Sequence, residues 1–152
     1  MTNSSVHDSK ECSADELAFW ELASEERREF VVEKDPPAMV YDLEERTARF
    51  GEQIILFAKK IPWGPVNNRL VDQLVGAGTS VGANYCEADD GISRADFKHR
   101  ISICRKEARE TKFFLRMVAG ARLESWLGAR DLWKEAHSLH RIFSRIWRST
   151  KL

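Results

Sequence analysis

The chain has 152 residues, 43% of them hydrophobic, which suits a single domain with its own core and a short extension. Its 24 basic residues balance its 24 acidic residues, and this zero net charge argues against a strongly basic nucleic-acid-binding protein. No apolar run is long enough to cross a membrane and the N terminus does not resemble a signal peptide, so we expect a cytoplasmic protein without a membrane partner.

The first region, residues 1–38, is acidic, with four Lys and Arg against ten Asp and Glu, a net charge of −6. Residues 39–152 hold the other 20 basic and 14 acidic residues, a net charge of +6. A helix is expected from Ser13, which forms a capping-box pattern with Glu16, to about Glu33. Pro36 and Pro37 then end it. We therefore expect a partly helical, acidic N-terminal extension over residues 1–38 and a separate domain over residues 39–152.

Four further helices follow from apolar residues spaced by three and four. The first ends at the IPWGP turn, the second begins at Pro65 and stops at Gly91 as a left-handed cap, and the third opens at a capping box of Ser93 and Asp96. The fourth follows a loop region between Gly120 and Gly128. The four stripes are Leu43, Thr47, Phe50, Ile54, Phe57 and Ile61; Leu70, Leu74, Ala77, Val81, Tyr85 and Ala88; Phe97, Ile101, Cys104, Ala108, Thr111, Leu115 and Val118; and Leu132, Ala136, Leu139, Phe143 and Ile146.

Four apolar stripes of similar length must bury one another. The predicted fold is therefore all-α, an antiparallel up-and-down four-helix bundle over residues 39–152. Trp63 and Trp126 are expected in loops of this bundle.

The second of these helices carries a family resemblance. Its segment QLVGAGTSVGANYCEAD, residues 73–89, resembles a signature of the four-helix-bundle family encoded within intervening sequences of bacterial 23S ribosomal RNA genes. The flanking helices YDLEERTARFGEQIILFAKKIP and FKHRISICRKEARETKFFLRMV also resemble that family, so the similarity spans about residues 41–149. A departure is Gly76, where the family commonly has a basic residue. The signature polar residues are Gln73, Asn84, Glu87 and Glu110.

The resemblance implies a homo-oligomer, typically a pentameric ring, with a role near RNA or nucleic-acid-handling proteins. A related accessory protein of retroelements binds nucleic acid and a reverse transcriptase. These implications concern partners, and they leave open what Asn84 and Glu87 do. Their side chains either line a channel or contact a partner, or they form hydrogen bonds with a neighbouring helix or cap the interior of the bundle, which we favour.

The last helix carries a second, non-core stripe. Tryptophan rings beside guanidinium groups are suited to stacking on bases and binding phosphates, but the same residue types are enriched where subunits pack. Two interpretations stay open, a weak and non-specific nucleic-acid interface or a subunit interface, and we favour the subunit interface. The residues are Trp133, His137, His140 and Trp147, flanked by Arg141, Arg145 and Arg148.

No pattern in the chain indicates an enzyme, a cofactor or a metal. A di-metal bundle needs two Glu-x-x-His motifs, and the chain has only Asp96-x-x-His99. Cys12, Cys86 and Cys104 are widely spaced, which is typical of free thiols. Two functions remain, a non-enzymatic oligomer that associates weakly with RNA or DNA, and a purely structural or protein-interaction oligomer. The distribution of the +6 charge discriminates between them.

Overall fold

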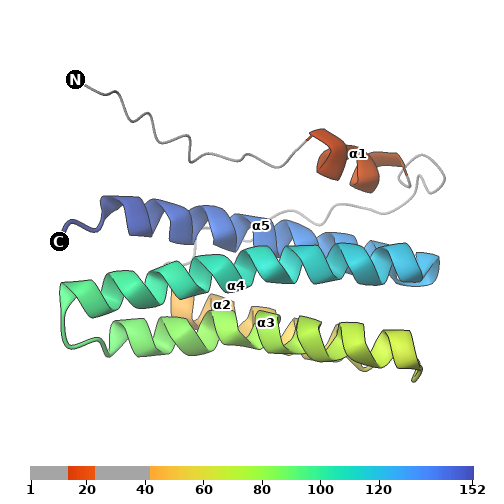
Figure 1. Ribbon diagram of the computed structural model, residues 1–152, viewed down its shortest axis with the longest axis horizontal. Helices are drawn as coiled ribbons and strands as arrows, with labels where there is room; N and C mark the ends of the chain where they lie inside the picture. Colours follow the sequence, from red (N-terminus) through yellow and green to blue (C-terminus); the bar gives the residue numbers. More distant parts are fainter. Residues whose placement is uncertain (1–13, 23–41) are drawn as a thin grey trace. The chain divides into compact units, whose positions relative to one another are not determined.

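The computed structural model describes residues 14–22 and 42–152 of the chain, and these residues are helical with short connections (Figure 1). Contacts between residues divide the chain into two units, Met1–Ala38 and Met39–Leu152. The first unit contributes helix α1, Ala14–Leu22. This confirms a helix in the extension, whereas the capping residue Ser13 and the stretch up to Glu33 lie outside the described residues.

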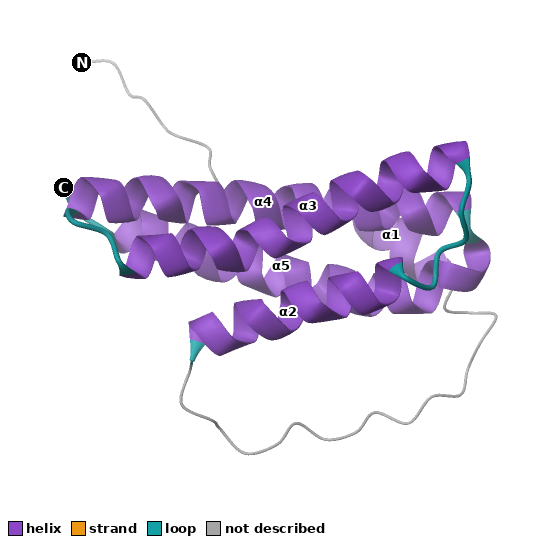
Figure 2. Cartoon of the chain, turned by 90° about the horizontal axis from the view of Figure 1, so that it is seen from below, coloured by secondary structure: helices purple, strands orange, loops and turns teal. Residues whose placement is uncertain are grey.

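The second unit is the predicted antiparallel four-helix bundle. Each helix packs on the next one along the chain, and α2 closes the ring of four by contacting α5 (Figure 2). The contact between α2 and α5 is the sparsest of the four, and α2 is also the shortest of these helices. The bounds are α2, Leu43–Ala58; α3, Pro65–Asp89; α4, Arg94–Ala121; and α5, Trp126–Ser149, preceded by a 3₁₀ turn, η1, at Leu123–Ser125.

The core consists of the predicted stripes. Phe50, Ile54, Leu74, Ile101 and Phe143 are almost completely shielded from solvent, as burial of apolar surface requires. Five members of the stripes lie at the margin of the core and are only half-buried, namely Phe57, Leu70, Tyr85, Phe97 and Ile146.

Local sequence signals predict most of the helix ends correctly. Ser93 Oγ accepts a hydrogen bond from the Asp96 N–H at 3.1 Å, which confirms the predicted cap of α4. Asp42 caps α2 in the same way, accepting from the Glu45 N–H. Pro65 occupies the first position of α3, where no N–H is needed.

The expected left-handed conformation of Gly91 is wrong. No glycine among the described residues has φ in the left-handed region. The chain instead turns tightly, with the Gly91 N–H donating to Ala88 O at 3.0 Å. A Cβ on residue 91 would lie 2.9 Å from that same oxygen, so glycine is needed here for close approach.

The expected loop position of Trp126 is also wrong, whereas Trp63 does lie in the turn between α2 and α3. Trp126 is the first residue of α5 and is 5% exposed. Helix α5 thus starts before Gly128, which packs against the Phe57 ring. A Cβ on Gly128 would stand 3.2 Å from this ring, so the missing side chain makes room for the first turn of α5.

Small residues allow α2 and α3 to approach closely. A Cβ on Gly78 would lie 2.9 Å from two carbons of Ile54, and one on Gly82 would lie 3.3 Å from Thr47 Oγ1. Thr47 itself is buried and donates to its own helix, at Leu43 O. This half of the bundle is therefore held by close backbone packing.

Candidate nucleic-acid or subunit interface on helices α4 and α5

Charge is divided unequally between the two halves of the bundle. Helices α4 and α5 together carry 13 Lys and Arg against five Asp and Glu. Helices α2 and α3 carry three Lys and Arg against six Asp and Glu. The net positive charge of the domain is therefore clustered on α4 and α5.

The basic residues of α4 form a row along one face. Their spacing of seven, four, three and four residues keeps them within one helical stripe, which flanks the buried stripe that contains Ile101 and Leu115. We call these five residues the α4 row: Lys98, Arg105, Arg109, Lys112 and Arg116.

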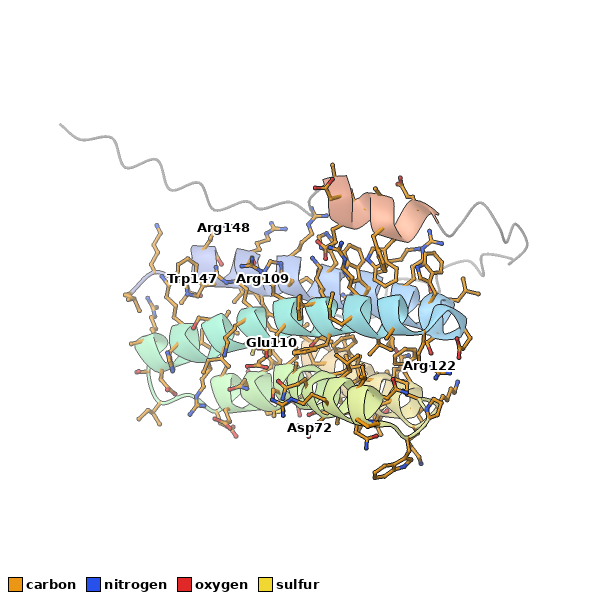
Figure 3. The ribbon with its side chains drawn as sticks, turned by 45° about the vertical axis from the view of Figure 1, so that its right-hand side comes forward. Asp72, Arg109, Glu110, Arg122, Trp147 and Arg148 are labelled. Carbon is orange, nitrogen blue, oxygen red and sulfur yellow. The ribbon has the colours of Figure 1, made fainter. Side chains whose placement is uncertain are left out.

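Helix α5 faces this row with aromatic rings and cations. Trp133 is 4% exposed, and its ring stacks on His137 with centroids 5.4 Å apart. His140 and Trp147 are half-buried on the same stripe. Arg141, Arg145 and Arg148 are exposed on the adjoining stripe, the α5 row. Figure 3 shows Arg109, Trp147 and Arg148 on the α4 and α5 side of the bundle and Asp72 on α3. The two rows and the four aromatic residues together constitute the basic face.

Cations of the α4 row lie against the tryptophan rings of α5. Lys98 Nζ and Arg105 Cζ are 4.9 Å and 4.6 Å from the centroid of Trp147. Lys112 Nζ is 4.8 Å from the centroid of Trp133, and this lysine is only 7% exposed. Such contacts attract a cation to the negative face of the ring and hold it in position.

His140 lies in a half-buried environment beside positively charged side chains. Burial, followed by the positive charges of Lys112 and Arg105, lowers the pKa of His140 from 6.5 to about 4. His137 and Arg109 act in the same direction. His140 is therefore neutral at pH 7.

Comparison with known proteins decides the family. The family model described as "23S rRNA-intervening sequence protein" matches residues 41–145, which is more than half of the chain. The chain belongs to this family. The resemblance given by residues 73–89 is thus confirmed.

A solved structure shares the fold. It is a protein of unknown function from the S23 ribosomal protein family of Bacteroides thetaiotaomicron, with a TM-score of 0.62 and 24% sequence identity. The match covers 70% of this chain and 99% of that one. No curated protein matches the chain.

The polar residues of the family signature make local and interhelical contacts. Glu87 of α3 forms an ion pair with Arg100 of α4, the neighbouring-helix partner that we favoured. Asn84 instead donates to Ser80 O on its own helix, at 2.8 Å. Glu110 lies on the side of α4 toward α3 (Figure 3), where burial and the charge of Glu110 raise the pKa of Glu107. Gln73 is half-buried on α3, so the family residues lie outside the basic face.

The α4 row was missing from the sequence-based candidates. Its only signal was the recurrence of Lys and Arg at positions 98, 105, 109, 112 and 116, which by itself also fits a solvated helix surface. Of the candidates on α5, the structure brings Trp133, His137, His140 and Trp147 together on one stripe and leaves the three arginines beside it.

Other features of the bundle are weaker candidates for a functional site. In the described part of the chain, no three His, Cys, Asp or Glu side chains gather into a group that could hold a metal ion. None of the described helices combines the length and apolar content needed to cross a membrane. A shallow hollow of about 370 Å³ between α2 and α3 is lined mainly by small residues such as Gly51, Gly82 and Ala83.

Proposed function

We propose that this protein is a non-enzymatic, self-associating bundle that binds RNA or DNA weakly through its basic face. The observation that carries the proposal is the segregation of charge, 13 basic against five acidic residues on α4 and α5. Eight of these basic residues belong to the α4 and α5 rows of the basic face, and charge gathered in this way attracts a polyanion, whereas scattered charge would not.

The binding is expected to be independent of sequence. Phosphate contacts supply affinity and position, while contacts with base edges supply specificity. The α5 row, Arg141, Arg145 and Arg148, is exposed and offers its guanidinium groups to phosphates. Affinity from such contacts falls steeply with salt because each contact releases counterions.

Self-association is supported by apolar side chains around the turn between α2 and α3. Leu56 is 60% exposed, Val66 is 66% exposed, and Trp63 is 91% exposed. Exposed apolar side chains of this size, including a tryptophan, are typical of a surface that another protein covers. The pentamer itself is expected from the family resemblance. Light scattering at micromolar concentration tests association, and a monomer would contradict it.

The absence of enzymatic activity is part of the proposal. Burial raises the pKa of the Cys104 thiol to about 12, so this group is not a nucleophile at neutral pH. The lowered pKa of His140, about 4, likewise makes it a poor general base at pH 7.

Removal of the acidic extension tests the nucleic-acid proposal. Without residues 1–38 the net charge of the chain changes from zero to +6. The shortened protein should bind RNA and DNA more tightly than the full chain and with a steeper salt dependence, measured by fluorescence anisotropy over a salt series.

The same experiment distinguishes the alternative function, a protein-interaction oligomer without nucleic-acid binding, which the exposure of Trp63 and Leu56 favours. If the shortened protein remains oligomeric and binds neither RNA nor DNA at low salt, the alternative replaces the proposal.

A further inference from the structure

We infer that the basic face reads the phosphate backbone of a duplex, and that its tryptophans hold cations in place instead of stacking on bases. The inference rests on the proposed function and deepens it, because it names the form of nucleic acid that the face prefers.

The ring of Trp147 is already engaged. Lys98 Nζ and Arg105 Cζ both lie within 5 Å of its centroid, at 4.9 Å and 4.6 Å. Lys98 is fixed further because its Nζ donates to Thr150 O at 2.9 Å. An unpaired base that stacked on this ring would have to displace the cations from it. Proteins that bind single strands instead present open aromatic platforms beside a basic groove.

The other two rings are still less accessible to a base. Trp126 and Trp133 are 5% and 4% exposed. Arg130 Cζ lies 5.3 Å from the centroid of Trp126, and Lys112 Nζ lies 4.8 Å from that of Trp133. Every tryptophan of α5 thus has a cation against its ring, and the exposed guanidinium groups of the α5 row remain available to a ligand.

The arrangement of the cations suits a rigid ligand. The α4 row extends over 19 residues, from Lys98 to Arg116, which corresponds to about 27 Å of helix. The α5 row lies on the neighbouring helix, and the axes of two packed helices are typically about 8–10 Å apart. Apart from the buried Lys112, the two rows of cations suit the two phosphate strands that border a groove of a duplex, whose bases are enclosed. Because Lys98 and Arg105 are already held against the Trp147 ring, binding restricts these two side chains little further.

The test compares a fluorescently labelled duplex of about 20 base pairs with each of its strands alone, using full-length protein at low salt. The duplex should bind at least about fivefold more tightly than either strand. Tryptophan emission is recorded in a Trp63→Phe background, because Trp63 is 91% exposed and would respond to any contact. Saturation with either ligand should change the remaining emission by less than about 10%, since no base reaches a ring.

Two substitutions separate charge from stacking. Arg105→Gln removes a cation and keeps Trp147, and it should weaken duplex binding severalfold, while Arg105→Lys should retain most of it. Circular dichroism confirms that each variant is folded.

The outcomes distinguish this inference from the function on which it rests. Tighter binding of a single strand, with strong quenching of tryptophan emission and no effect of Arg105→Gln, would overturn the inference and leave nucleic-acid binding intact. Failure of both the duplex and the strands to bind would overturn both.

Discussion

Helices α2 and α3 meet through glycines and other small side chains, whereas α4 and α5 carry large rings and cations along the edge of their contact. In the first pair, the Ile54 side chain fills the space above Gly78, and no room is left for a Cβ. In the second pair, Trp147 and Trp133 lie beside Lys98, Arg105 and Lys112 at the margin of the core. The comparison indicates that side-chain volume limits stability in the α2 and α3 half, whereas the exposed cations of the α4 and α5 half, such as Arg141 and Arg145, can lose their charge without unfolding the chain.

Two glycines of α3 provide the largest expected contrast. Gly78→Ala should lower the free energy of unfolding by about 2–3 kcal/mol, because the new Cβ would collide with Ile54 at 2.9 Å. Gly76→Ala is the matched control, since a Cβ there meets nothing within 4 Å, and it should raise the free energy of unfolding by about 0.5–1 kcal/mol. Urea denaturation measures both. Equal effects at the two positions would mean that close packing does not hold α2 against α3.

Acidification should weaken the α4 and α5 half through His140. Its pKa of about 4 in the folded chain lies below the ordinary 6.5, so the unfolded chain binds more protons between these values. The contribution of His140 to stability is complete above about pH 6.5 and is lost as the pH falls toward about 4. The loss is on the order of 2 kcal/mol.

The variant His140→Gln isolates this contribution. Its free energy of unfolding should fall less than that of the wild-type chain between about pH 7 and pH 4, by a difference on the order of 2 kcal/mol. Parallel pH profiles for the two proteins would show that burial and the neighbouring cations do not depress this pKa.

A smaller effect on the free energy of unfolding is expected from a substitution at the contact between α2 and α5. Arg46 of α2 donates from Nε to Glu135 Oε1 at 2.6 Å, and from Nη2 to Glu135 Oε2 at 3.0 Å and Ser138 Oγ at 2.8 Å. This bidentate pair ties α2 to α5 where other contacts are sparse. Glu135→Gln should cost about 1–2 kcal/mol of unfolding free energy.

The exposed pair of Glu45 and Arg49 on α2 supplies the control. Glu45→Gln should change the free energy of unfolding by less than about 0.5 kcal/mol, because solvent screens an exposed pair. If the two substitutions have the same effect, the pair formed by Arg46 and Glu135 does not help to position α2.

The bundle could be predicted from the sequence because its core residues repeat with the helical period. Ile101, Cys104, Ala108 and Leu115 are all buried, as their spacing predicts. Two details of the predicted bundle were wrong for local reasons. The turn at Gly91 uses close approach to Ala88 O instead of a left-handed residue, and α5 begins at Trp126, before Gly128.

The basic face could be predicted only in part. The stripe containing Trp133 and His137 follows from spacing within one helix. Lys112, in contrast, sits in a strongly charged stretch of sequence and is nevertheless buried against Trp133. Its role depends on how α4 packs on α5, and no pattern within a single helix contains that information.

The most direct test of the account removes three exposed cations from one half of the bundle or from the other. Arg141, Arg145 and Arg148 are changed to Gln in one variant, and Lys59, Lys60 and Arg69 in the second, so that net charge falls equally. Nucleic-acid affinity is then measured over a salt series. The account predicts that the first variant loses about tenfold or more in affinity and that its salt slope falls by up to about three, while the second binds almost like the wild-type chain. Equal losses in the two variants would show that net charge alone governs binding, and would contradict a binding face on α4 and α5.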